Sequence, residues 1–170
     1  MMELDDLLAE ATASVEEMYF RLPVDGGEPI FRERVYCYEL YHQLRVRWPK
    51  DCPYALNGEV DKRAHPRLRP LGAEFNMPDL LVHTPGDMHG NYAIIEVKPG
   101  NAARAGIEKD IGTLSRFLND VGYERAIYLL YGRLPLAAIV EFASKTPHNK
   151  PIEVWVHEQP RGTAHFVRAV

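Results

Sequence analysis

The stretch that decides the fold reads Pro-Asp-Leu-Leu-Val over residues 78–82, then a loop, then Ile-Ile-Glu-Val-Lys over residues 94–98. Both runs are short and mostly apolar, as expected for buried strands. The loop between them carries Pro85-Gly86 and Gly90-Asn91, which are typical of turns. The pattern predicts a β-hairpin with strands over about 78–83 and 92–98.

The expected register of this hairpin brings polar side chains together. If the loop is centred near Met88, Asp79 lies across from residue 97, beside Glu96 and Lys98. Side chains two apart along a strand project from the same face, so Glu96 and Lys98 point together. We therefore expect two carboxylates and an ammonium to converge at one end of the hairpin.

Such a group of charges predicts a metal-assisted hydrolase. Two carboxylates held close together raise one another's pKa unless a cation neutralises them. Mg²⁺ binds one or two carboxylates and completes its shell with water and substrate phosphate. A bound metal activates a phosphoryl oxygen and a water, and a nearby lysine stabilises developing charge. These are the roles that phosphodiester hydrolysis needs.

The pattern Pro78-Asp79 followed by Glu96-Val97-Lys98 resembles the active-site signature of the PD-(D/E)xK nuclease superfamily, which has the restriction-endonuclease-like fold. The resemblance covers about residues 29–131. It implies that Asp79 and Glu96 bind Mg²⁺ or Mn²⁺ with help from the Val97 carbonyl, and that Lys98 positions the attacking water.

The rest of the chain agrees with an α/β fold of this kind. Apolar spacing predicts the following further elements: helices over about 2–20, 30–48, 103–120 and 135–145, and strands over about 54–60, 125–131, 152–157 and 164–168. The strand over 125–131 is almost continuously apolar, which predicts burial on both faces. We expect a single domain over residues 1–170. Its αβββαβ core has a central mixed sheet flanked by helices, with an N-terminal helix before it and a C-terminal helix and hairpin after it.

Two more carboxylates are candidate metal ligands. Glu59 ends the first core strand, and an antiparallel neighbour would bring it towards Asp79. The alternative is a solvated glutamate paired with Lys62. Glu39 lies on the helix over 30–48, where related nucleases often carry a glutamate. However, its helical position points away from the apolar stripe of that helix.

The charge of the chain gives mixed indications on whether it binds nucleic acid. The chain has 20 Lys and Arg against 24 Asp and Glu, a net charge of −4, whereas strong DNA-binding proteins tend to be basic. Positive side chains nevertheless cluster in the loop before Asp79 and on the helix after Lys98. We expect the following residues to contact nucleic acid phosphates: Lys62, Arg63, Arg67, Arg69 and Lys109. The resemblance favours DNA over RNA.

The expected function is therefore a metal-dependent nuclease, with an endonuclease acting on DNA favoured, in defence, repair or recombination. Two alternatives stay open: a non-catalytic nucleic-acid-binding or assembly module that keeps the fold, and a subunit that acts only in a larger nuclease complex. A homodimer also stays open. No apolar run is long enough to span a bilayer, and the acidic start lacks the features of a signal peptide. We expect a cytoplasmic protein that does not bind membranes.

Overall fold

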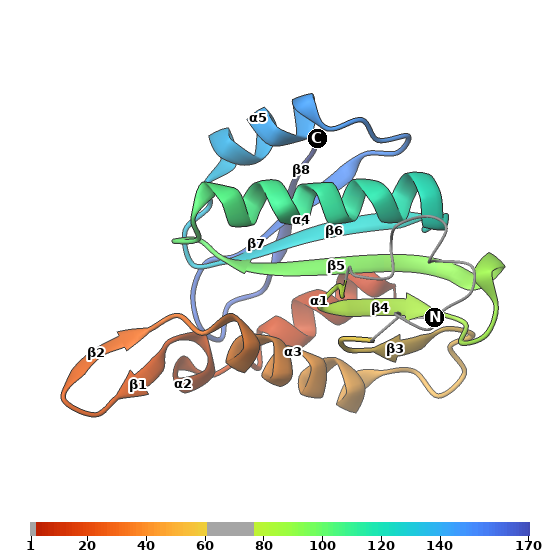
Figure 1. Ribbon diagram of the computed structural model, residues 1–170. Helices are drawn as coiled ribbons and strands as arrows, with labels where there is room; N and C mark the ends of the chain where they lie inside the picture. The colour runs from red at the N-terminus through yellow and green to blue at the C-terminus, as the bar shows by residue number, and fades with distance from the viewer. Residues whose placement is uncertain (1–2, 61–76) are drawn as a thin grey trace.

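The predicted hairpin lies within a six-stranded mixed sheet in the computed structural model of the protein (Figure 1). The structure describes residues 3–60 and 77–170. The strands lie in chain order, β3-β4-β5-β6-β7-β8. The pairs β5–β6 and β6–β7 are parallel, and the other neighbouring pairs are antiparallel. The expected α/β class, with a mixed sheet flanked by helices, is confirmed.

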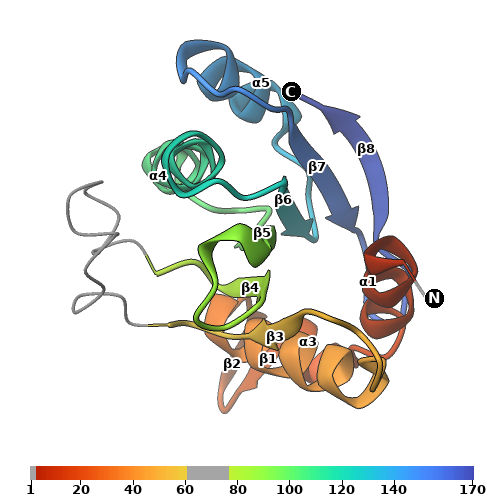
Figure 2. The same ribbon diagram turned by 90° about the vertical axis from the view of Figure 1, so that its right-hand side faces the viewer.

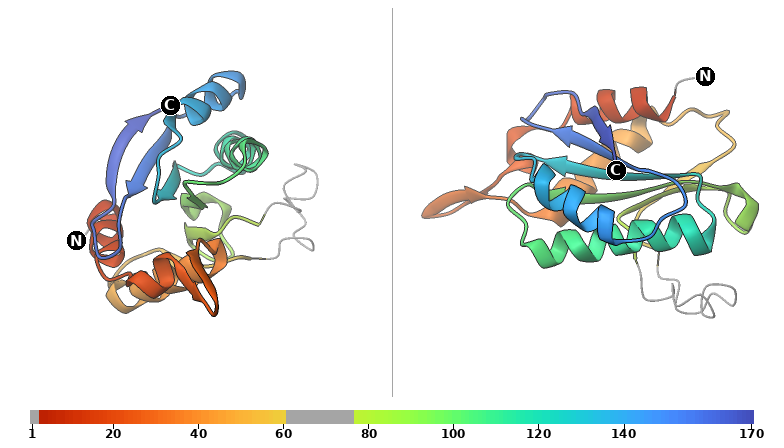
Figure 3. Two further views of the ribbon diagram at one scale, coloured as in Figure 1. Left: turned by 90° about the vertical axis from the view of Figure 1, so that its left-hand side faces the viewer. Right: turned by 90° about the horizontal axis from the view of Figure 1, so that it is seen from above.

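The elements of the described chain have the following bounds: α1 Leu4–Thr12, α2 Glu17–Phe20, β1 Leu22–Val24, β2 Gly27–Ile30, α3 Glu33–Arg47, β3 Ala55–Asn57, β4 Leu80–His83, η2 Met88–Gly90, β5 Asn91–Pro99, α4 Arg104–Arg116, η3 Phe117–Val121, β6 Arg125–Tyr131, α5 Leu136–Lys145, β7 Ile152–His157 and β8 His165–Ala169. The predicted strands over 125–131 and 152–157 have the observed bounds. The predicted strand over 54–60 is shorter, since only Ala55–Asn57 pairs with β4. The β1–β2 hairpin, which was not predicted, projects from the body of the protein (Figure 3).

Helices cover both faces of the sheet, and each face has its own core (Figure 2). Residues of α1 and α3 pack on one face, and residues of α4, η3 and α5 pack on the other. Strand β6 serves both cores, because Ile127 and Leu129 face the first while Tyr128 and Leu130 face the second. The predicted burial of this strand on both faces is confirmed.

The single helix predicted over 2–20 is wrong, because the chain breaks after Thr12. The Thr12 hydroxyl donates to the Leu8 carbonyl at 2.7 Å and accepts the Ala164 N–H at 2.8 Å. Side-chain bonds of this kind compete with the helical pattern. The Val15 carbonyl, freed from the helix, accepts the Arg161 N–H at 2.9 Å. The break therefore ties the N-terminal region to the chain just before β8.

The register of the β4–β5 hairpin differs from the prediction by one residue. Leu80 pairs with Ile95, so the next position outward places Asp79 opposite Glu96 rather than Val97. The loop closes through a bond from the Thr84 N–H to the Gly90 carbonyl, and an irregularity follows between Val82 and His83. Directly opposed residues of an antiparallel pair share a face. The observed register thus puts Asp79 and Glu96 on the same face of the sheet.

None of the helices within residues 3–60 and 77–170 combines the length and apolar character needed to cross a bilayer.

The end of β5 is packed too closely for a side chain at Gly100. The Gly100 N–H donates to the Tyr131 carbonyl, and an added Cβ would overlap the carbonyl of Arg133. We expect Gly100→Ala to lower the free energy of unfolding in urea by about 2–3 kcal/mol. Gly112→Ala is the control, because no atom of residues 3–60 or 77–170 lies within 4 Å of its added Cβ. Gly112→Ala should be neutral or raise stability by about 0.5–1 kcal/mol, since glycine in a helix interior is less stable than alanine. Equal effects of the two changes would contradict this packing.

Candidate active site

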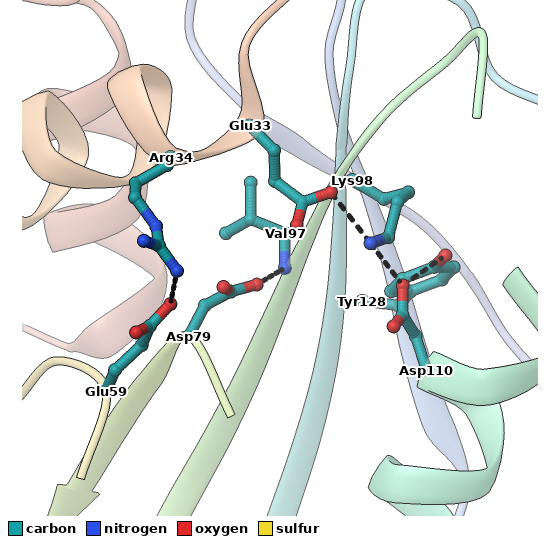
Figure 4. A network of polar contacts seen from close by, with 8 residues as sticks. All are labelled: Glu33, Arg34, Glu59, Asp79, Val97, Lys98, Asp110 and Tyr128. Carbon is teal, nitrogen blue, oxygen red and sulfur yellow. Dashed lines mark hydrogen bonds and ion pairs between the residues drawn. The ribbon is translucent and has the colours of Figure 1, made fainter. Parts of the chain in front are cut away.

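A polar cavity of about 230 Å³ lies where β4 begins and β5 ends. The first turn of α3 and the middle of α4 complete its walls. It is lined by Glu33, Arg34, Glu59, Met77, Asp79, Glu96, Lys98, Lys109, Asp110 and Thr113. The three residues of the predicted signature thus line one cavity. Figure 4 shows most of the charged side chains around it.

The Asp79 carboxylate is fixed by the backbone of the neighbouring strand. Its Oδ2 accepts the Val97 N–H at 2.7 Å (Figure 4). Asp79 lies one residue before β4 begins, so its carboxylate takes the place of a backbone acceptor beside β5. It is also hydrogen-bonded to the carboxyl group of Glu96, which is only 7% exposed. One oxygen of Asp79 is thereby oriented, and the two carboxyl groups meet.

This arrangement raises the pKa of both acids above the usual range. Burial raises the pKa of Asp79 to about 6, and the charge of Glu33 adds to the rise, while the Val97 N–H opposes it. Burial also raises the pKa of Glu96 well above its ordinary value, with further contributions from Asp79 and Asp110. A carboxyl pair of this kind shares a proton unless a cation replaces it.

Lys98 lies between two other carboxylates rather than directly on the pair. Its Nζ is 2.7 Å from Glu33 Oε2 and 3.0 Å from Asp110 Oδ2 (Figure 4). Asp110 also accepts the Tyr128 hydroxyl at 3.2 Å. Burial disfavours the charged form of Lys98, but Glu33 and Asp110 outweigh burial and raise its pKa. Lys98 is therefore a fixed positive charge at the cavity wall.

The other predicted ligands differ in where they lie. Glu59 lines the cavity, as predicted, and pairs with Arg34 at 3.3 Å, while Lys62, its predicted alternative partner, lies outside the described residues. Glu39 lies outside it, where its carboxylate accepts from Gln43 at 2.6 Å, in a row of polar contacts along α3. The expectation that Glu39 belongs to the site is not supported by this placement, because its helical position faces away from the sheet.

The predicted phosphate contacts are described only in part. Lys109 is exposed and lines the cavity from α4. The loop residues Lys62, Arg63, Arg67 and Arg69 lie outside the described residues.

Sequence reasoning missed Glu33 and Asp110, although a signal for each was present. Glu33 precedes Cys37 by four residues and Leu40 by seven, so it belongs to the apolar stripe of α3. Asp110 lies between Ile107 and Ile111 on the buried face of α4. A carboxylate on the apolar face of a helix needs a partner in the core, and here both meet Lys98.

No three His, Cys, Asp or Glu side chains within residues 3–60 and 77–170 form a group that could hold a metal ion. The carboxyl groups of Asp79 and Glu96 interact with each other and line the same cavity. Mg²⁺ needs no more than one or two carboxylates from a protein.

The raised pKa of Asp79 predicts a pH dependence of stability. The folded protein holds this proton up to about pH 6, whereas an unfolded aspartate releases it near about pH 4. Between these values the folded state binds more protons, so rising pH lowers the free energy of unfolding. The loss should be on the order of 1–2 kcal/mol after allowance for solvent screening. Urea unfolding at pH 4.5 and pH 7 should show a smaller loss for Asp79→Asn. Glu39→Gln should keep the wild-type loss, and identical profiles for all three proteins would contradict the assignment.

The pairing of Lys98 with Asp110 predicts a strong energetic coupling. Lys98→Ala leaves the nearly buried Asp110 unpaired, which should cost about 3 kcal/mol of unfolding free energy. Asp110→Asn in the Lys98→Ala background should recover part of that loss, with a coupling of about 1–3 kcal/mol in a double-mutant cycle. The exposed pair Arg104–Glu141 is the control and should couple by less than about 1 kcal/mol. Equal couplings would show that Lys98 and Asp110 are not held together in the folded protein.

Comparison with known proteins does not assign the chain to a family. No protein-family model, curated protein or solved structure matches the chain. The resemblance to PD-(D/E)xK nucleases therefore depends on the signature residues and on the arrangement of the elements that carry them.

Proposed function

We propose that this protein is a metal-dependent nuclease of the PD-(D/E)xK type, which hydrolyses phosphodiester bonds in DNA. The observation that carries the proposal is the meeting of Asp79 and Glu96 in a cavity that Lys98 also lines. Buried like charges cost stability unless a cation compensates them. Two acids at this position lower the stability of the fold, so their presence indicates a functional role.

The arrangement of the elements supports the finer assignment to a restriction-endonuclease-like core. The elements α3, β3, β4, β5, α4 and β6 follow the expected order of helix, three strands, helix, strand. The first three strands are antiparallel neighbours, and β5 and β6 are parallel. This order places the acids of the signature at adjoining strand ends.

The donor set fits Mg²⁺ or Mn²⁺. Asp79 and Glu96 would hold the ion through carboxylate oxygens, with Glu59 and the Val97 carbonyl as further oxygen donors. Such an ion, when bound, supplies Lewis-acid activation of the phosphodiester and of water. Because the pKa values of both acids are raised, a metal ion would compete with protons for their carboxylate oxygens. Metal binding should therefore strengthen as pH rises.

The charged residues of the wall have separate roles. Lys98 holds a fixed positive charge, which would orient the attacking water and stabilise charge that develops on the phosphate. Glu33 and Asp110 keep its ammonium in place through the two ion pairs. Lys109 is exposed at the same cavity and would contact a phosphate of the substrate.

One observation favours the alternative of a non-catalytic nucleic-acid-binding module. Lys98 is paired with two carboxylates, so its charge is already compensated. In the catalytic interpretation, substrate phosphate competes for this ammonium. In the binding-module interpretation, the ion pairs stabilise the fold and nothing more.

Cleavage assays separate these two functions. Purified protein should cut DNA with Mg²⁺ or Mn²⁺ and not with EDTA, and cutting of circular DNA would establish an endonuclease. Asp79→Asn and Glu96→Gln should each lower the rate by at least about a hundredfold, because they remove metal ligands. Glu39→Gln should retain activity, as its carboxylate lies outside the cavity.

Lys98 needs a stability-matched test, because its loss also weakens the fold. The double variant Lys98→Ala/Asp110→Asn should be inactive although partly restored in stability, whereas Asp110→Asn alone should keep some activity. If wild type cuts no nucleic acid with any of these metals, or if the double variant cuts as well as Asp110→Asn alone, Lys98 has no catalytic role.

A further inference from the structure

A second cavity adjoins the acidic one, between α3 and the ends of β3 and β4. Its volume is about 290 Å³, and it shares Arg34, Glu59 and Asp79 with the first. The other lining residues are Cys37, Tyr38, Tyr41, Gly58 and Leu80. The two cavities therefore meet at Asp79, with carboxylates on one side and aromatic rings on the other.

The aromatic side of this cavity comes from one face of α3. Arg34, Tyr38 and Tyr41 are spaced by four and three residues, so they lie above one another on the helix. Tyr38 is 64% exposed, and within the described chain it makes no hydrogen bond, ion pair or ring contact. Tyr41 is half-buried and donates to the Leu56 carbonyl at 3.5 Å. One ring is thus anchored and the other is free to accept a partner.

Arg34 lines both cavities. Its ion pair with Glu59 is long, at 3.3 Å, and both side chains are exposed. Exposed pairs of this kind are weak, so a ligand can replace Glu59 at little cost. A guanidinium stacks on flat rings and also binds phosphate.

We infer that this second cavity binds an unpaired nucleobase next to the scissile phosphate, so that the substrate is single-stranded nucleic acid or an unpaired end. The inference rests on the proposed function, since Asp79 defines where the phosphate lies. An exposed tyrosine beside an arginine matches the stacking platforms of single-strand binding sites. The cavity is near the lower limit of roughly 300–1,000 Å³ for small-molecule sites, which suits one base. A base within a duplex is stacked and paired and cannot enter it.

Binding measurements test the inference without relying on cleavage. Fluorescence anisotropy, with EDTA and again with Ca²⁺, would compare a labelled single-stranded DNA, its duplex, the same strand with abasic sites, and a single-stranded RNA. We expect the intact single strand to bind at least about tenfold more tightly than the duplex or the abasic strand. The comparison with RNA shows whether the unpaired base comes from DNA or from RNA.

Two variants probe the cavity from different sides. Tyr38→Ala should weaken single-strand binding by about tenfold or more and leave duplex binding unchanged, whereas Tyr38→Phe should retain affinity, because the ring does the stacking. Gly58→Leu should also weaken binding by filling the cavity, since among the described residues only the Asp79 carbonyl, at 4.0 Å, lies within 4 Å of an added Cβ. Phe166→Ala is the matched control, an exposed aromatic on β8 outside both cavities.

The outcomes separate this inference from the proposed function. Equal binding of intact and abasic strands, equal binding of single strand and duplex, or an unaffected Tyr38→Ala variant would overturn the base site. Cleavage that still depends on Asp79 and Glu96 would in that case leave the nuclease standing. Conversely, single-strand binding that requires Tyr38 in a protein that cuts nothing would keep the base site and favour the binding module.

Discussion

The carboxyl groups of Asp79 and Glu96 meet in a largely buried part of the site. The surrounding polar contacts are arranged around this buried pair of acids. Two acids in this position cannot both ionise without a compensating charge. The Val97 N–H fixes one of them, and burial together with the neighbouring Asp79 raises the pKa of the other. Lys98 adds positive charge, but its ammonium is held by Glu33 and Asp110. The site is thus a set of coupled charges rather than a row of independent ligands.

The fold supplies this set from four separate segments. The residue just before β4 is Asp79, the end of β5 contributes Glu96 and Lys98, α3 contributes Glu33 and α4 contributes Asp110. Strand pairing fixes the first three relative to each other, because a one-residue slip would move them to opposite faces. The helices then pack on both faces of the sheet, which fixes the two partners of Lys98. Packing of the two cores therefore determines the geometry of the charges.

The sequence was sufficient for the parts of the site that depend on strand periodicity. Alternation and turn residues located the hairpin and the strand ends that carry Asp79, Glu96 and Lys98. Their convergence on one face depends on the observed register, since the predicted one would place Asp79 on the face opposite to Glu96 and Lys98. The register was wrong by one residue because an irregularity beside His83 leaves no mark in an apolar pattern. The partners of Lys98 depend on how two helices pack against the sheet, which local patterns do not specify. Even so, a carboxylate within the apolar face of α3 or α4 was a readable sign of a buried partner.

The position of Asp79 explains how one small domain could join chemistry to recognition. Its carboxylate faces the acidic cavity, while the same residue also lines the apolar cavity behind the first turns of α3. The acidic cavity, with its carboxylates and the Lys98 ammonium, is the proposed site for a metal ion and a phosphate. The second cavity has tyrosine rings, Cys37 and Leu80 in its lining, and burial raises the pKa of the Cys37 thiol, so this cavity suits the flat, largely apolar surface of a base. A nucleotide, which joins a phosphate to a flat ring, is the ligand that we propose for the two adjoining cavities.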